Sequence, residues 1–391
     1  MDDYLKIEKA LNGKPQRWSD QIFEPSAEKC IRDGKYIVGV LEGEGIGPEI
    51  ISAALIVLSA LESKGECSFE VRKGGPIGRD AELQYGKALC DPVVDFCRDI
   101  FSKGGAVLAG PGGGRFVYDM RREFDLFCKI SPIRGFEELR NTCRIPHRYL
   151  TGTDIILIRE NSSGIYQGRW SETVTGKDGR RAEHSFCYTE REVCRILKVA
   201  AKTAQLRQGE ITVVFKDAGI PSISRLWHDC MLKIASEFGV RSRLMDIDYA
   251  AYYLIQHSQE LDVVVSPNLF GDILSDVGGV LLGSRALSYS GNFSEDGSGV
   301  YQTNHGAGYD IAGTGRANPI GQIFSLAMML RESFGLMKEA LLIESAVTHV
   351  WRQGWRTADL AEDSCRLAGT QEMGELIAET ITRMYSSIEK G

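Results

Sequence analysis

The stretch Pro267-Asn268-Leu269-Phe270-Gly271-Asp272-Ile273-Leu274-Ser275-Asp276 lies where one hydrophobic pattern gives way to another. Before it, residues 261–265 (Leu-Asp-Val-Val-Val) have the length and β-branched content of a buried strand. After it, apolar residues recur at helical spacing: Ile273, Val277, Val280 and Leu281. The segment therefore predicts a strand, a turn and a helix, and this unit organises the rest of the chain.

Two acidic residues of this unit, Asp272 and Asp276, are four positions apart and so share one face of the expected helix. Like charges at this spacing repel by roughly 0.2–0.5 kcal/mol unless something binds between them. Mg²⁺ or Mn²⁺ would reverse that sign, because hard divalent cations select carboxylate oxygens. Acidic residues near a helix N-terminus also complement the helix dipole. The spacing alone leaves both interpretations open.

The composition excludes several classes of protein. The chain has 391 residues, of which 43% are hydrophobic and 25% charged, with a net charge of −7 that argues against a nucleic-acid partner. Ten cysteines without a Cys-x-x-Cys pair and six histidines without His-Glu-x-x-His predict reduced thiols and no zinc site. With no long apolar run and an acidic N-terminus, we expect a cytoplasmic protein without a membrane span or secretory signal.

The segment from Asn268 to Asp276 resembles the signature of the β-decarboxylating dehydrogenases, the family of isocitrate, isopropylmalate, homoisocitrate and tartrate dehydrogenases. The resemblance runs from about Tyr36 to the C-terminus, with further motifs in the family's order. It implies an α/β fold in which a central mixed sheet is flanked by helices, with two discontinuous domains and a cleft between them. The implied parts are an N-terminal extension (1–35), a large cofactor-binding domain (36–126 plus 283–391) and a small domain (127–282) with a dimerisation arm at about 163–190.

Two glycine-rich runs follow short apolar strands. Residues 42–50 (Glu-Gly-Glu-Gly-Ile-Gly-Pro-Glu-Ile) follow the strand 36–41 and lead into a helix, and residues 110–114 (Gly-Pro-Gly-Gly-Gly) follow 106–109. Neither is a Gly-x-Gly-x-x-Gly fingerprint, so a Rossmann unit is not indicated. The resemblance places the first loop beside the cofactor and the second near the nicotinamide ring.

The family holds substrate carboxylates with three arginines, and this chain keeps two of them. Arg121 matches the first, and the segment 159–166 (Arg-Glu-Asn-Ser-Ser-Gly-Ile-Tyr) places Arg159 on the third and Tyr166 on the catalytic tyrosine. Ser131 stands at the second position, where a hydroxyl cannot copy the bidentate fork of a guanidinium. We therefore expect a substrate other than isocitrate.

Other cations lie near these positions. Any of them could supply positive charge to the substrate carboxylates from another direction. We expect each to lie instead on the solvated surface: Arg115, Arg122, Lys129 and Arg134.

The catalytic lysine of the family has two candidates here. Aligned through the strand 211–216, Lys216 matches it; aligned backward from Ser224, Asp217 does. We favour Lys216, because a slip of one residue moves every side chain of a strand to the opposite face. Asp248, in the expected helix 247–255, corresponds to a third metal carboxylate that relatives donate across the dimer.

The segments 304–313 and 317–319 resemble the family's adenosine-binding loop, and the helices beyond Ile320 are expected to be amphipathic. A carboxylate in this loop accepts from a ribose 2′-OH and repels a 2′-phosphate, which favours NAD over NADP. The implied cofactor-binding residues are His305, Gly306, Asp310, Ile311 and Asn318.

The resemblance thus implies a homodimer with shared active sites that oxidises and decarboxylates a 3-substituted malate-type hydroxy acid with NAD and Mg²⁺ or Mn²⁺. Tyr166 and Lys216 would transfer protons, and Asp248, Asp272 and Asp276 would bind the metal. Two alternatives remain open. One is a non-decarboxylating or phosphonate-type dehydrogenase of a specialised pathway. The other is a catalytically silent regulatory subunit.

Overall fold

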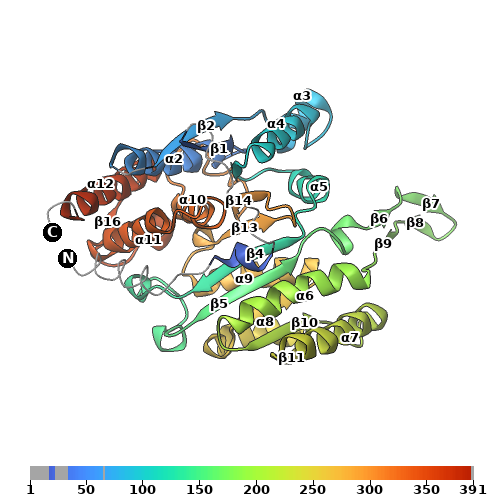
Figure 1. The fold of residues 1–391 in the computed structure, drawn as a ribbon. Coiled ribbons are helices and arrows are strands. Elements are labelled where there is room, and N and C mark those ends of the chain that lie inside the picture. Colours follow the sequence, from blue (N-terminus) through green and yellow to red (C-terminus); the bar gives the residue numbers. More distant parts are fainter. Residues whose placement is uncertain (1–16, 23–33, 65–66, 389–391) are drawn as a thin grey trace.

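A ten-stranded sheet runs through the computed structural model, which describes residues 17–22, 34–64 and 67–388 (Figure 1). Its strands, in spatial order, are β11 (Arg241–Asp246), β10 (Glu210–Phe215), β12 (Val263–Ser266), β5 (Asp154–Glu160), β4 (Cys128–Arg134), β13 (Tyr289–Phe293), β14 (Gly299–Thr303), β3 (Ala106–Ala109), β1 (Lys35–Leu41) and β2 (Ser68–Lys73).

The two ends of the sheet are parallel and its middle is antiparallel. Strands β11, β10, β12 and β5 run parallel to one another, as do β14, β3, β1 and β2. Between them, β4 is antiparallel to β5, and β13 is antiparallel to both β4 and β14. The predicted mixed central sheet is confirmed. The β4–β13 ladder crosses between the two predicted domains, whose boundaries remain a prediction.

Strand β1 shows how the half of the sheet near the termini is packed. Val38 and Val40 face one layer of helices, while Ile37 and Leu41 face the other, as the alternation of side chains along a strand requires. The helices of this half are α2 (Gly47–Lys64), α3 (Gly78–Tyr85), α4 (Asp91–Ser102), α5 (Phe116–Glu123), α10 (Ile320–Glu332), α11 (Met337–Arg352) and α12 (Thr370–Ile388).

Helix α10 corrects one expectation. All of its residues are buried, so it is a central helix and not an amphipathic one. It lies among β13, β14, α2 and α11, and apolar contact on every side explains why its sequence shows no polar face. Its charged end is neutralised internally, because Arg331 pairs with Glu332 and Glu344.

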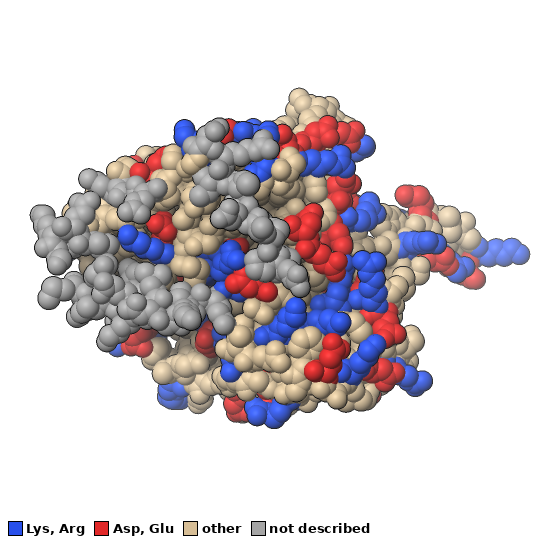
Figure 2. All heavy atoms as spheres, in the orientation of Figure 1, with Lys and Arg blue, Asp and Glu red and all other residues tan. Residues whose placement is uncertain are grey.

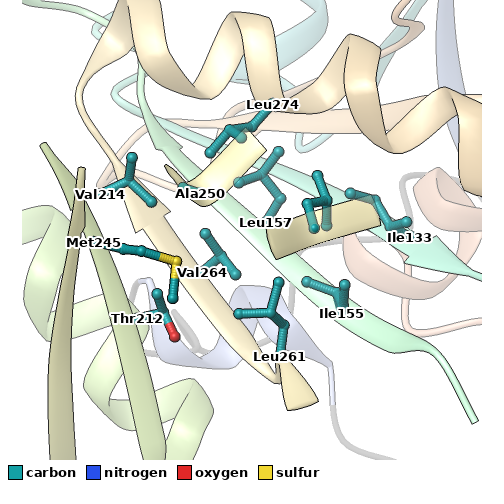
Figure 3. A pocket seen from close by; sticks show the side chains of 11 residues that line it. Ile133, Ile155, Leu157, Thr212, Val214, Met245, Ala250, Leu261, Val264 and Leu274 are labelled. Atoms are coloured by element: carbon teal, nitrogen blue, oxygen red, sulfur yellow. The ribbon is translucent and has the colours of Figure 1, made fainter. Parts of the chain in front are cut away.

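The other half of the sheet has helices on both faces: α6 (Glu190–Gln205) and α7 (Pro221–Phe238) in front in Figure 1, α8 (Ile247–Gln256) and α9 (Asn268–Leu281) behind. Helix α6 begins with a complete capping box formed by Thr189 and Glu192. A narrow apolar pocket remains between strands and α8–α9, lined by side chains such as Met245 and Leu274 (Figure 3). Its one hydroxyl, from Thr212, accepts a hydrogen bond from Arg243 Nε, so the pocket offers no free polar group to orient a ligand.

A thin arm projects from the body at the right of Figure 1. It consists of two small antiparallel pairs, β6 (Arg169–Trp170) with β9 (His184–Ser185) and β7 (Val174–Gly176) with β8 (Gly179–Arg181). Gly176 pairs with Gly179 across the turn, so the arm ends in a hairpin. The remaining short strands, β15 (Trp355–Arg356) and β16 (Arg366–Leu367), pair with each other.

Most of the N-terminal extension (1–16 and 23–33) lies outside the described residues. Its described part, the short helix η1 (Trp18–Gln21), is held against the end of α10. Ser19 donates through its backbone N–H to Glu332 Oε2 at 2.9 Å, and the Arg331 guanidinium lies over the Trp18 ring. This part of the extension therefore packs on its own chain.

Two further features concern the surface charge and the hydropathy of the described residues. On the described part of the face in Figure 2, Lys and Arg are intermingled with Asp and Glu and form no continuous basic band. Within residues 17–22, 34–64 and 67–388, no helix combines the length and the apolar character that crossing a membrane requires.

Candidate active site

Arg159 anchors a polar cluster where β5 meets the start of α9. The side chain is 2% exposed, and its Nε and Nη2 donate to Asn268 Oδ1 at 3.1 and 2.7 Å. Its Nη1 pairs with Asp272 Oδ1 at 2.5 Å. Burial would raise the pKa of Asp272, but the charges of Arg159 and Lys129 outweigh it, and that pKa lies below its ordinary value. Asp272 is therefore held as a carboxylate.

Tyr166 completes this cluster from the short helix η4 (Ile165–Gln167). Its hydroxyl donates to Asp272 Oδ2 at 2.8 Å, and its ring packs on Tyr118 with centroids 4.9 Å apart. Burial, and then the charge of Asp272, raises the pKa of Tyr166. The hydroxyl therefore keeps its proton at neutral pH and can donate it. The structure brings together three of the predicted site residues: Arg159, Tyr166 and Asp272.

Two further cations are buried beside the cluster. Arg121, at the end of α5, is 5% exposed, and Lys129, on β4, is 4% exposed. Burial, and then the charge of Arg159, lowers the pKa of Arg121. Burial, and then the charges of Arg121 and Arg159, lowers the pKa of Lys129 well below its usual value. The expectation that Lys129 is solvated is wrong. Its place between Cys128 and Ile130 in a buried strand was the available signal.

The other three cations differ from one another. Arg115 packs over the Trp170 and Tyr118 rings at the base of the arm. Arg134 keeps a side chain that is 41% exposed, in line with the expected surface position, and it pairs with Glu344 at 3.4 Å. Arg122 is exposed, as expected.

Ser131 is buried two residues beyond Lys129. Its hydroxyl accepts from Asn304 Nδ2 at 3.3 Å, which ties β4 to the loop after β14. The Ser131 side chain carries no charge, whereas the family has a positively charged arginine at this position.

The three predicted metal ligands are not gathered within one chain. Asp276, one turn after Asp272 on α9, pairs with Arg285 at 2.8 and 3.0 Å. Asp248, at the start of α8, instead pairs with Lys216 Nζ at 2.7 Å. In the described ranges, no three acidic, histidine or cysteine side chains come close enough to bind one metal ion.

Lys216, and not Asp217, faces the neighbouring acidic side chains. Its Nζ also pairs with Asp246 at 3.1 Å. Hydrogen bonds to Asp248 and Asp246 raise the pKa of Lys216. Lys216 lines a pocket of about 280 Å³ with apolar side chains from the start of α9, Leu269 and Phe270, whereas Asp217 is exposed.

The two glycine-rich loops meet at Glu44, a buried residue whose role the sequence did not reveal. Its carboxylate accepts from the backbone N–H of Gly113 in the second loop and of Arg79 at the start of α3, the latter at 2.7 Å. Next to it, Gly45 has φ +59°, and an added Cβ would lie 2.0 Å from the Ala307 carbonyl oxygen. Here glycine lets the first loop touch the predicted adenosine-binding loop.

Substituting Gly45 by alanine is expected to separate these loops. The left-handed backbone alone costs a non-glycine residue about 1–3 kcal/mol, and the contact with Ala307 adds to this cost. Thermal unfolding and dinucleotide titration would measure the effect. Gly306→Ala is the matched control for stability, because a Cβ there meets nothing within 4 Å. Equal melting temperatures for the two variants would contradict the prediction.

The predicted cofactor residues lie along the loop after β14. His305 Nδ1 is 3.0 Å from the Gly306 carbonyl oxygen, and its buried Nε2 has no hydrogen-bond partner among the described residues. Burial lowers the pKa of His305. Asp310 is exposed, and Ile311 packs against Ile46.

Asn318 has a structural role that the sequence did not show. Its Oδ1 accepts from the Ile320 N–H at the start of α10, and its Nδ2 donates to Asp359 Oδ2. Both ends of its amide are therefore engaged within the chain.

Buried arginines beside a carboxylate and a protonated tyrosine, on a mixed sheet whose two glycine-rich loops meet at Glu44, suit a dehydrogenase that acts on an anionic hydroxy acid. Residues 37–377 match the family described as isocitrate/isopropylmalate dehydrogenase. The chain belongs to this family of oxidative, decarboxylating dehydrogenases.

Its relatives have closely similar lengths. The chain is 36% identical over 367 residues to the 3-isopropylmalate dehydrogenase of Carboxydothermus hydrogenoformans, covering 89% of this chain and 95% of that protein. It is 37% identical over 355 residues to that of Desulfitobacterium hafniense, covering 87% and 98%. The crystal structure of isocitrate dehydrogenase from Methylococcus capsulatus matches with a TM-score of 0.78 at 28% identity, covering 89% of this chain and 99% of that one.

Proposed function

We propose that the protein is an NAD-dependent, metal-dependent enzyme that oxidises and decarboxylates a 3-substituted malate, and that isocitrate is not its substrate. The observation that carries the proposal is the cluster of Arg159, Tyr166 and Asp272, with two further buried cations beside it. Such a cluster suits a small dianion whose hydroxyl and carboxylates must be held in a fixed orientation. Ser131 supports the exclusion of isocitrate, because it removes a guanidinium from the carboxylate site.

The donor chemistry fits Mg²⁺ or Mn²⁺. Asp272 and Asp276 offer only carboxylate oxygens from one helix face, and both remain partly exposed. Asp248 would supply the third carboxylate from a second subunit. When bound, the metal would polarise the substrate hydroxyl and its α-carboxylate, and NAD⁺ would accept the hydride.

The chain's own residues would orient the substrate and move protons. Arg121 and Arg159 would hold the carboxylate that leaves as CO₂, and Tyr166, kept protonated, would donate a proton to carbon afterwards. Lys216 of the second subunit would take the hydroxyl proton. Since its hydrogen bonds to Asp248 and Asp246 raise its pKa, it can act as a base only after those carboxylates take other partners.

A homodimer would complete the site. Helices α8 and α9 lie side by side and expose four apolar residues, which we call the helix-pair patch: Tyr249, Tyr252, Ile273 and Val280. The patch lies on the two helices that carry Asp248, Asp272 and Asp276, so a second copy packed there would bring both acidic groups close together.

Charging the helix-pair patch should dissociate the dimer. In the double variant Tyr252→Glu/Val280→Glu, association would bury four unpaired carboxylates per dimer, which is strongly unfavourable. Light scattering should report a monomer, and activity should be lost with it. Leu83→Glu, on α3, is the control, because Leu83 is 87% exposed and far along the chain from the patch. A dimeric double variant would refute this interface.

NAD is proposed as the cofactor because of Asp310. Its exposed carboxylate lies in the loop that corresponds to the adenosine site, where it would accept from a ribose 2′-OH and repel a 2′-phosphate.

The function is tested with a panel of 3-substituted malates, including 3-isopropylmalate, isocitrate, tartrate and phosphonate analogues, with NAD⁺ or NADP⁺. Reduced nucleotide and CO₂ should form together in Mg²⁺ and stop in EDTA. Reduced nucleotide without CO₂ would indicate the non-decarboxylating alternative. Nucleotide binding without turnover on any acid would indicate a regulatory subunit, and NADP⁺ preference would refute the role given to Asp310.

A further inference from the structure

Strand β4 presents Lys129 and Ser131 on the same face, because side chains two residues apart on a strand point the same way. The β4–β5 ladder sets Lys129 directly opposite Arg159. Facing residues of antiparallel strands have Cβ atoms about 4.5–5.5 Å apart on a common face. Lys129 therefore emerges on the side of the sheet that carries the Arg159–Asp272 pair.

The charge of Lys129 is not balanced within the described chain. Five of its Lys and Arg residues are buried, each at most 9% exposed, and three have carboxylate partners: Arg159 with Asp272, Arg331 with Glu344, and Arg356 with Glu362. The other two are Arg121 and Lys129. In the described residues, neither side chain makes an ion pair or a hydrogen bond; Arg121 has only the Tyr118 ring at 5.7 Å.

Both unpaired cations lie in the same cluster, beside Arg159. A buried charge without a partner is costly, and like charges facing each other across two strands repel. One carboxylate, Asp272, cannot balance three cations. An entering anion would relieve both costs, so the arrangement is that of a site built for an anion.

From this geometry we infer that Lys129 supplies the third cation of the carboxylate site, in place of the arginine that the family has at position 131. The inference rests on the proposed function, since it assigns a contact to the same substrate. Lys129 would hold the carboxylate through a compact charge with three rotatable donors, instead of through a planar fork. Lys129 lies two residues before position 131 on β4. The small Ser131 side chain leaves room that an arginine at this position would fill.

The test measures anion binding separately from turnover. L-malate, with two carboxylates, and L-lactate, with one, are titrated against the protein by thermal shift and calorimetry. We compare the wild type with Lys129→Gln, Lys129→Arg and the double variant Lys129→Gln/Ser131→Arg. Lys87→Gln, which removes an exposed lysine paired with Asp91, is the control for loss of a charge.

In Lys129→Gln, the preference for malate over lactate should fall at least tenfold, while the melting temperature without ligand stays the same or rises, because repulsion with Arg121 and Arg159 is removed. If Lys129 instead only stabilised the fold, Lys129→Gln would melt at a lower temperature than the wild type. Lys129→Arg should keep most of the preference, and the double variant should regain part of it by moving the charge to position 131. On a turned-over substrate, KM should rise more than kcat falls.

The outcomes distinguish this inference from the proposed function. Turnover of the malate panel with unchanged malate affinity in Lys129→Gln would overturn the role of Lys129 and leave the function standing. Malate binding that depends on Lys129, without turnover of any panel acid, would support the role of Lys129 and reject the function. A Lys129→Gln protein that melts lower and binds malate normally would show a structural lysine and would also overturn the inference.

Discussion

Replacing Asp272 by asparagine is expected to lower kcat by about 1,000-fold or more, the upper range for removing one preorganised electrostatic contact. Asp272 lies at the centre of the site: it pairs with Arg159 at 2.5 Å, accepts from the Tyr166 hydroxyl at 2.8 Å and is a proposed metal ligand. Asparagine keeps the shape of the side chain and can still accept one hydrogen bond. The loss of turnover would therefore measure the effect of removing the negative charge of Asp272.

The measurement is steady-state turnover in saturating Mg²⁺ or Mn²⁺, with thermal unfolding as the test of folding. Asp229→Asn is the control, because Asp229 is an exposed carboxylate on α7 outside the cluster. Wild-type turnover of Asp272→Asn in Mg²⁺ would rule out both the metal assignment and the central role of this carboxylate.

Replacing Lys216 by methionine should lower kcat by about 10²–10⁴-fold, the usual contribution of a positioned acid or base. Methionine keeps the length of the chain and suits the apolar side of the pocket formed with Leu269 and Phe270. Asp217→Asn is the matched control at the adjacent position and should have nearly wild-type activity. If Asp217→Asn lost activity and Lys216→Met kept it, the catalytic role would belong to Asp217.

Mixing the two inactive proteins tests whether subunits share sites. After denaturation and joint refolding, about half of the dimers should be mixed, and each would contain one site with Lys216 and Asp272 both intact. Activity should therefore return to about a quarter of the wild-type value. If each site were built from one chain, the mixture would stay inactive.

Much of the fold follows from short-range patterns. The strand and helix around Pro267 appear as β12 and α9, and the predicted strand 106–109 is β3. Each of these elements has a hydrophobic period confined to its own residues, with glycine or proline at its end. Such signals need no knowledge of distant parts of the chain.

Burial of individual side chains was predicted less well. Lys129 and α10 both depend on neighbours far away in the sequence: Lys129 lies between β5 and β13, and α10 lies among β13, β14, α2 and α11. From the sequence alone, a lysine in a strand is expected to face solvent. Only the structure shows that Lys129 is buried next to two other buried cations, Arg121 and Arg159. The ion pairs Lys216–Asp248 and Asp276–Arg285 are likewise set by tertiary contacts.

The sequence by itself determined the family, the order of the elements and the residue types available for chemistry, because motifs and periodicity are local properties of the chain. Only the tertiary structure decided which charges lack partners. It left Arg121 and Lys129 unbalanced beside Arg159 and held Asp248 apart from Asp272. The reason is physical: electrostatic balance depends on distances through space, which the packing of remote strands and helices sets.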